Sequence, residues 1–100
     1  MPVLKFNEMT WTEIQQQELS RAVAILPVGA TEAHGPHLTL NTDVIIADAM
    51  AQAGARKLLG RGITVFILPP LHYTSASFAS NFPGTISLSP KTVTNTILDI

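Results

Sequence analysis

Two short apolar runs on either side of a helical segment constrain the fold more than any other feature of the chain. Residues 23–28 (VAILPV) and 63–68 (ITVFIL) are almost continuously apolar, which is typical of strands buried on both faces of a parallel sheet. The segment between them predicts a helix over about residues 44–59, so the three elements form a βαβ unit with a right-handed crossover. Two strands alone do not make a stable sheet, so we expect further strands from later sequence to pair with them.

The central helix carries recognisable signals at both ends. Thr42 or Asp43 is the expected N-cap, and Gly60 follows the last helical residue, where glycine is favoured. Apolar residues with helical spacing predict the stripe that packs against the sheet. This expected stripe consists of Ile45, Ile46, Ala49, Met50 and Ala53.

Two further helices are expected near the ends of the chain. Thr10 and Glu13 have the spacing of a capping box, which predicts a short helix through about Leu19. Ser89 and Pro90 read as an N-cap and a first helical residue. This last helix reaches the end of the chain without a C-cap, which we interpret as the front part of a longer protein. Residues 71–88 between the second apolar run and this helix predict a long, functional loop.

The composition excludes several classes of partner. Six Lys and Arg residues balance seven Asp and Glu residues, for a net charge of −1, so neither nucleic acid nor an anionic membrane is expected as the main partner. The chain has no cysteine, which excludes disulfides and thiolate metal sites and suits a reducing cytoplasm. No apolar stretch approaches the ~20 residues of a membrane helix, and the first residues do not resemble a signal peptide.

Metal-capable side chains gather directly after the first apolar run. Glu32 and His34 point to the same side if the backbone is extended, and Asp43 follows nine residues later. Open α/β sheets place their sites at the carboxyl ends of strands. His72, just past the second run, should therefore lie on the same rim of the sheet.

These residue types suit a hydrolytic metal site. Imidazole and carboxylate groups bind Zn²⁺ or Mn²⁺, and a carboxylate such as Asp43 can bridge two ions. Metal-bound water has a pKa near ~7, which supplies a nucleophile at neutral pH. The residues alone leave other roles open: Asp43 can simply cap the helix, His37 can be a hydrogen-bonded loop residue, and His72 can belong to a loop or a pocket. The stretch GATEAHG is not a phosphate loop, because Gly-Lys-Ser/Thr does not follow.

The stretch PVGATEAHGPHLTLNTD, residues 27–43, resembles the first signature of the creatininase (creatinine amidohydrolase) family. NFPGTISL, residues 81–88, resembles the second signature of the same family. The chain departs from the usual pattern at Thr39, where Pro is common, at Asn41, where Gly is common, and at Asn81, near which a His is often found. None of these departures falls on the three candidate ligands.

This resemblance implies a three-layer α/β/α sandwich with a mostly parallel sheet, of which residues 1–100 are the N-terminal part of a single domain. It implies a metal-dependent amidohydrolase that cleaves a C–N bond of a small cyclic or linear amide through a hydroxide between two metal ions, most often zinc or manganese. Glu32 would bind one ion, His34 the other, and Asp43 would bridge them. A His and a Glu from the later half of the family's sequences would complete the site.

The resemblance also implies a homo-oligomer, with hexamers among the forms that the family adopts. Substrates known for the family include creatinine, a formamide on a pyrimidine intermediate and a short peptide. The alternative is a non-catalytic α/β binding or assembly module that keeps the fold without turnover. The presence of all three ligand types in this chain favours the enzyme.

Overall fold

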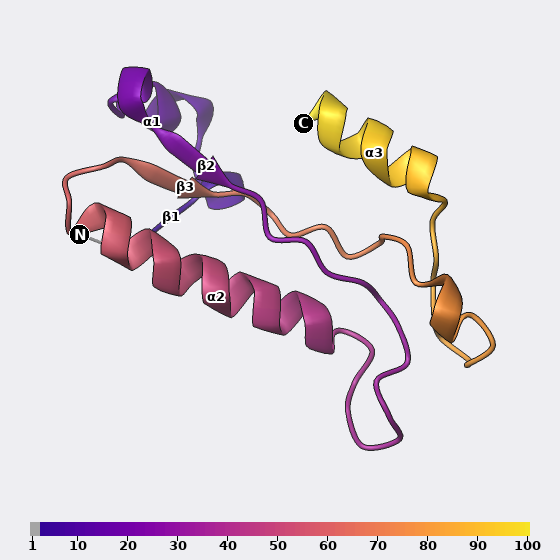
Figure 1. The fold of residues 1–100 in the computed structure, drawn as a ribbon. Helices are drawn as coiled ribbons and strands as arrows, with labels where there is room; N and C mark the ends of the chain where they lie inside the picture. The colour runs from indigo at the N-terminus through magenta and orange to yellow at the C-terminus, as the bar shows by residue number, and fades with distance from the viewer. Residues whose placement is uncertain (1–2) are drawn as a thin grey trace.

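A computed structural model describes residues 3–100 of the chain, and its centre is a parallel sheet (Figure 1). The three strands are β1 (Leu4–Lys5), β2 (Val23–Ile25) and β3 (Val65–Ile67), in the order β1-β3-β2. Both neighbours of β3 are parallel to it. With the helix α2 (Thr42–Leu59) between β2 and β3, the predicted βαβ unit and the α/β fold class are confirmed. The third strand, β1, precedes this unit in the sequence, whereas further strands were expected only from later sequence.

The two strands of this unit differ in burial. All three residues of β3 are buried, as predicted. The expectation that the first run is buried on both faces was wrong for β2, since Val23 is 40% exposed. Among residues 3–100, β2 lies at one end of the strand order and pairs with β3, whereas β3 lies between two strands, so fewer side chains surround β2.

The helix α2 packs on the sheet through small residues. Val44, Ala51 and Ala55 are its buried residues, and the last two form a core cluster with Val65 and Ile67 of β3. The predicted packed stripe was wrong, because its large members are mostly exposed: Ile45 56%, Ile46 55% and Met50 69%. The helix carries apolar side chains on two faces, and the face with the alanines lets the helix approach the sheet closely.

The N-terminal helix α1 (Trp11–Gln15) has the predicted capping box. The Thr10 hydroxyl accepts from the Glu13 N–H, and the Glu13 carboxylate accepts from the Thr10 N–H. The helix is shorter than predicted, because Glu18 instead caps a separate 3-10 turn over Leu19–Arg21. The start of the chain is joined to the core by an edge-to-face contact of Phe6 with Phe66, whose ring centroids are 5.5 Å apart.

The C-terminal helix α3 (Pro90–Asp99) begins as predicted. The Ser89 hydroxyl accepts from the Thr92 N–H, and Pro90 stands at the start of the helix. The expected loop 71–88 contains one helical element, a 3-10 turn over Ser77–Ala79. Across residues 3–100, no helix is both long and apolar enough to cross a membrane.

Beyond the sheet, the segments that follow β2 and β3 continue side by side (Figure 1). The Leu68 N–H donates to the Ile25 carbonyl at 2.9 Å, and the Leu71 N–H donates to the Pro27 carbonyl at 3.0 Å. Val28 and Leu71 form an isolated parallel bridge. The two loops therefore leave the same rim of the sheet, as predicted for parallel strands.

Candidate metal centre

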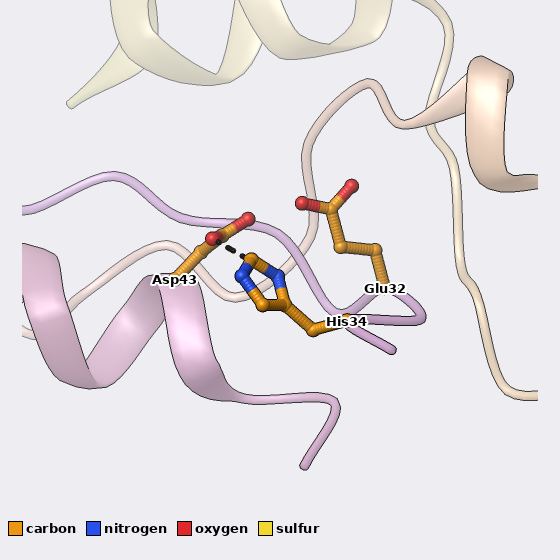
Figure 2. A group of neighbouring side chains, drawn as sticks. All are labelled: Glu32, His34 and Asp43. Carbon is orange, nitrogen blue, oxygen red and sulfur yellow. Dashed lines mark ion pairs between the residues drawn. The ribbon is translucent and has the colours of Figure 1, made fainter. Parts of the chain in front are cut away.

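Glu32, His34 and Asp43 converge at this rim (Figure 2). Each residue offers one ligand atom, and these atoms all lie within 4.8 Å of one another. The His34 Nδ1 atom lies 3.6 Å from Asp43 Oδ1. Glu32 is buried, with 8% of its surface exposed, whereas the side chains of His34 and Asp43 are 37% and 30% exposed. The three residues singled out in the sequence thus form one group that opens to solvent on one side.

Asp43 does not cap the helix. Asn41 occupies the N-cap position of α2 and makes no cap hydrogen bond through its side chain, while Asp43 lies in the first turn. The expectation of Thr42 or Asp43 as the N-cap was therefore wrong. The Thr42 hydroxyl instead donates to the Thr39 carbonyl at 2.7 Å, so the loop before α2 is fixed by Thr42 and the Asp43 carboxyl remains turned towards Glu32 and His34.

A close backbone approach places the start of α2 beside the Glu32 segment. A Cβ atom at Gly29 would lie 2.7 Å from the Val44 nitrogen and 2.9 Å from its Cα. No side chain fits there without moving the helix. Because Asp43 precedes Val44, the absence of a side chain at Gly29 sets the distance from the ligand-bearing segment to Asp43.

The loop between His34 and α2 is folded back on itself. The Glu32 N–H donates to the Leu40 carbonyl at 3.2 Å, which closes the loop at its base. Gly35 has a φ of +73°, a left-handed conformation that glycine adopts without strain. This turn directs the chain away immediately after His34, and the closed base returns it to the start of α2.

The electrostatics of the group favour a cation. The pKa of the Glu32 carboxyl lies above its ordinary value, first because a hydrogen bond with the Asp43 carboxyl favours the protonated form. Burial and the negative charge of Asp43 act in the same direction, and His34 acts against them. Within residues 3–100, His34 is the one basic group that forms an ion pair with either carboxyl. Two crowded carboxyl groups without a Lys or Arg partner can bind a positive ion in place of a shared proton.

This donor set fits divalent metal ions. Two carboxylates and one imidazole are ligands that Zn²⁺ and Mn²⁺ accept. The ligand atoms lie within 4.8 Å of one another, a spacing that could hold a metal ion. The residue types and their proximity therefore fit a divalent cation.

Two clefts adjoin the group. One, of about 430 Å³, is lined by Glu32, Asp43, Thr74 and Ser75 among others. The other, of about 440 Å³, is lined by His34 and by mainly apolar residues that include Leu40 and Phe82. Phe78 is 81% exposed and borders both clefts. A small molecule in either cleft would lie beside the candidate ligands.

The other two histidines lie outside the group. His72 borders a separate hollow with Tyr73 and Thr96, and the His72 carbonyl accepts from the Thr31 hydroxyl at 2.8 Å. The ring of His37 lies near Gly35, where a Cβ would be 3.0 Å from its Cε1 atom. His72 thus shares the rim through its backbone, and neither imidazole joins Glu32, His34 and Asp43.

Sequence reasoning missed the residues that hold the group in place. A glycine at position 29 is compatible with an ordinary turn, whereas in the structure it lets α2 approach closely. Thr85, within the second signature, accepts a hydrogen bond from the Ala33 N–H at 2.9 Å across 52 residues of sequence. The NFPGTISL motif was the available signal for Thr85, but a single sequence does not show which backbone group a hydroxyl will meet.

Comparisons with known proteins identify relatives of this chain. The family model described as "Creatininase: Creatinine amidohydrolase" matches residues 7–100. The creatinine amidohydrolase of Pseudomonas putida is 34% identical over 100 residues, which span 94% of this chain and 36% of that protein. The mycofactocin precursor peptide peptidase of Mycobacterium ulcerans is 35% identical over 79 residues, which span 75% of this chain and 32% of that protein.

Solved structures give the same result. A manganese form of creatininase superposes with a TM-score of 0.84 at 32% identity, covering 97% of this chain and 38% of that structure. This chain thus spans about a third of the length of the curated relatives that it matches. A family match over residues 7–100, a curated relative at 34% identity and close structural superposition together show that the chain belongs to the creatininase family.

Proposed function

We propose that this chain contributes part of the active site of a metal-dependent amidohydrolase, which cleaves a C–N bond in a small cyclic or linear amide. The observation that carries the proposal is the convergence of Glu32, His34 and Asp43 within 4.8 Å at the rim of a parallel sheet. The two kinds of relative support the reaction class, because a creatinine amidohydrolase and a peptide peptidase both act on an amide C–N bond.

In this proposal the three side chains hold two divalent ions. Glu32 would bind one ion, His34 would bind the other, and Asp43 would bridge them. The manganese form of creatininase supports manganese, and the imidazole-carboxylate donor set also suits zinc. When bound, such ions lower the pKa of water and polarise a carbonyl group. Further ligands, a His and a Glu in the family, come from sequence outside residues 1–100.

The buried Glu32 and its neighbour Asp43 have a defined role in this proposal, which is to bind a cation. An ionised Glu32 beside an ionised Asp43 is unfavourable in the absence of a cation, as the raised pKa of Glu32 indicates. Cation binding would relieve that repulsion, so the two carboxyl groups together form a binding site for a cation. His34 lies at the more exposed side of the group, next to the apolar cleft.

The substrate would enter through the two clefts beside these ligands. Ser75 and Phe78 line the cleft that contains Glu32 and Asp43, and Phe78 and Phe82 line the cleft that contains His34. We expect these residues of the 71–88 loop to contact the amide substrate. Tyr73, from the same loop, lines the separate hollow beside His72 and neither of these two clefts. By analogy with the family, we also propose that the full-length protein is cytoplasmic and forms a homo-oligomer, with the hexamer as one form that the family adopts.

The test is metal content and turnover of the protein in its full natural length. We expect transition metal after gentle purification, loss of amide hydrolysis on chelation and recovery on addition of Mn²⁺ or Zn²⁺. Creatinine, an N-formyl pyrimidine and short peptides form the substrate panel. A protein that binds no transition metal and hydrolyses none of these amides would refute the proposal and favour the non-catalytic assembly module.

A further inference from the structure

The second signature motif is bonded directly to the segment that carries two of the candidate ligands. The Thr85 hydroxyl oxygen accepts from the Ala33 N–H at 2.9 Å, in a partly buried setting. The next residue, Ile86, donates its N–H to the Thr31 carbonyl at 2.9 Å. Residues 31 and 33 are therefore both held from the same side by two consecutive residues that lie more than fifty positions away in the sequence.

Ala33 is the residue between the two ligands, which makes its N–H a sensitive point of attachment. In an extended segment, side chains alternate, so Glu32 and its neighbours change direction if the peptide on either side rotates. The 31–34 segment belongs to neither β2 nor any other regular strand. Its backbone is consequently fixed by a few individual hydrogen bonds. At the Ala33 N–H, the acceptor is the side-chain hydroxyl of Thr85.

We propose that Thr85 is a positioning residue for the metal centre: its hydroxyl fixes the Glu32–His34 segment in the geometry that binds metal. This inference rests on the proposed function, and it assigns to the second signature a role in holding the first. Groups that orient metal ligands without touching the metal affect metal affinity by about 10–100-fold when they are removed.

The same loop offers a matched control in Ser87. The Ser87 hydroxyl oxygen accepts from the Ala76 N–H at 2.8 Å, also in a partly buried setting. Thr85→Val and Ser87→Ala therefore each remove one hydroxyl acceptor from one backbone N–H. Only the first of these bonds reaches the ligand-bearing segment. Thr85→Ser keeps the hydroxyl and serves as the conservative variant.

The experiment is titration of the metal-free, full-length protein with Mn²⁺ alone by calorimetry. We expect Thr85→Val to raise the Kd for Mn²⁺ about 10–100-fold, while Thr85→Ser and Ser87→Ala bind as wild type does. Thermal unfolding without metal should shift similarly in Thr85→Val and Ser87→Ala, since each loses one hydrogen bond. Equal Mn²⁺ affinity in Thr85→Val and Ser87→Ala would overturn the positioning role.

Hydrogen exchange of backbone amides supplies a second readout that needs no metal, and its wild-type measurement needs no variant. In the metal-free wild type, the Ala33 amide should be protected, and in Thr85→Val it should exchange faster while Ala76 stays protected. An unprotected Ala33 amide in the wild type would contradict the proposal even if Thr85→Val failed to fold. Absence of Mn²⁺ binding by a wild type with a protected Ala33 amide would instead refute the proposed function.

Discussion

The His34 Nδ1 atom lies 3.6 Å from Asp43 Oδ1, although His34 lies in the loop that follows a strand and Asp43 in the first turn of a helix. The loop between them is closed by the bond from the Glu32 N–H to the Leu40 carbonyl. The two ligand candidates are therefore brought together by backbone structure and do not depend on their mutual ion pair. This arrangement leads to predictions in which the fold, the charge and the metal are separately tested.

Gly29→Ala should destabilise the protein by about 1–3 kcal/mol, the usual cost of overpacking. The new methyl group would lie 2.7–2.9 Å from atoms of Val44 and would push the start of α2 away. Chemical denaturation measures the loss. Gly54→Ala, within α2, is the control, because no atom lies within 4 Å of its new Cβ. Alanine in a helix interior should raise the free energy of unfolding by about 0.5–1 kcal/mol. Equal effects of the two substitutions would contradict the close approach at Gly29.

Glu32 should make the metal-free protein less stable as the pH rises. Its pKa is raised in the folded state, by Asp43 and by burial, so the folded protein binds more protons than the unfolded chain from about pH 4.3 upward. The stabilising contribution of the protonated group is complete below that pH and is lost as the pH rises through the folded-state pKa. Unfolding in urea with a chelator, from pH 4 to 8, measures this dependence.

Glu32→Gln isolates the contribution of Glu32 in the same pH series. The variant cannot ionise at this position, so we expect the difference in unfolding free energy between variant and wild type to grow in favour of the variant as the pH rises. A difference that is constant across the pH range would show that Glu32 ionises in the fold as it does in the unfolded chain. Saturating Mn²⁺ should reverse the trend for the wild type, because the metal requires the ionised carboxylate.

His34→Ala and His37→Ala separate metal binding from general effects of this loop. His34 belongs to the ligand group and His37, three residues later, does not. Loss of a group that only orients the metal ligands typically weakens metal binding roughly 10–100-fold. We expect His34→Ala to weaken Mn²⁺ binding by more than this, and His37→Ala to leave Mn²⁺ binding unchanged. Calorimetric titration of both variants measures the two affinities. A comparable loss in both would indicate that the loop, and not the imidazole of His34, decides binding.

Local sequence patterns predicted the fold correctly where each pattern has a single structural interpretation. The apolar run that became β3, the capping box at Thr10 and Glu13, and the Ser89–Pro90 helix start are all found as expected. The packing face of α2 was not predictable, because the helix has two apolar faces. The choice between them depends on how closely a helix with Ala51 and Ala55 can approach β3, which is a property of the packed state.

For the site, residue types and spacing predicted that three side chains would lie together, as they do in the structure, but left their roles open. Asp43 on its spacing alone reads first as a helix cap, and only the structure shows that Asn41 holds the cap position. The resemblance to the family signature favours a ligand role for Asp43. The supporting bond from the Ala33 N–H to Thr85 joins distant parts of the chain, so it depends on tertiary structure that neither periodicity nor spacing describes.

The most direct test of the central claim is the metal content of Asp43→Asn in the full-length protein, with Asp48→Asn as control. Asp48 lies on the same helix, is partly buried and accepts from Gln52, away from the ligand group. We predict two bound ions and full turnover in the wild type and in Asp48→Asn, and loss of both in Asp43→Asn. Two bound ions and full turnover in Asp43→Asn would contradict the bridging role of Asp43 and the metal centre built on it.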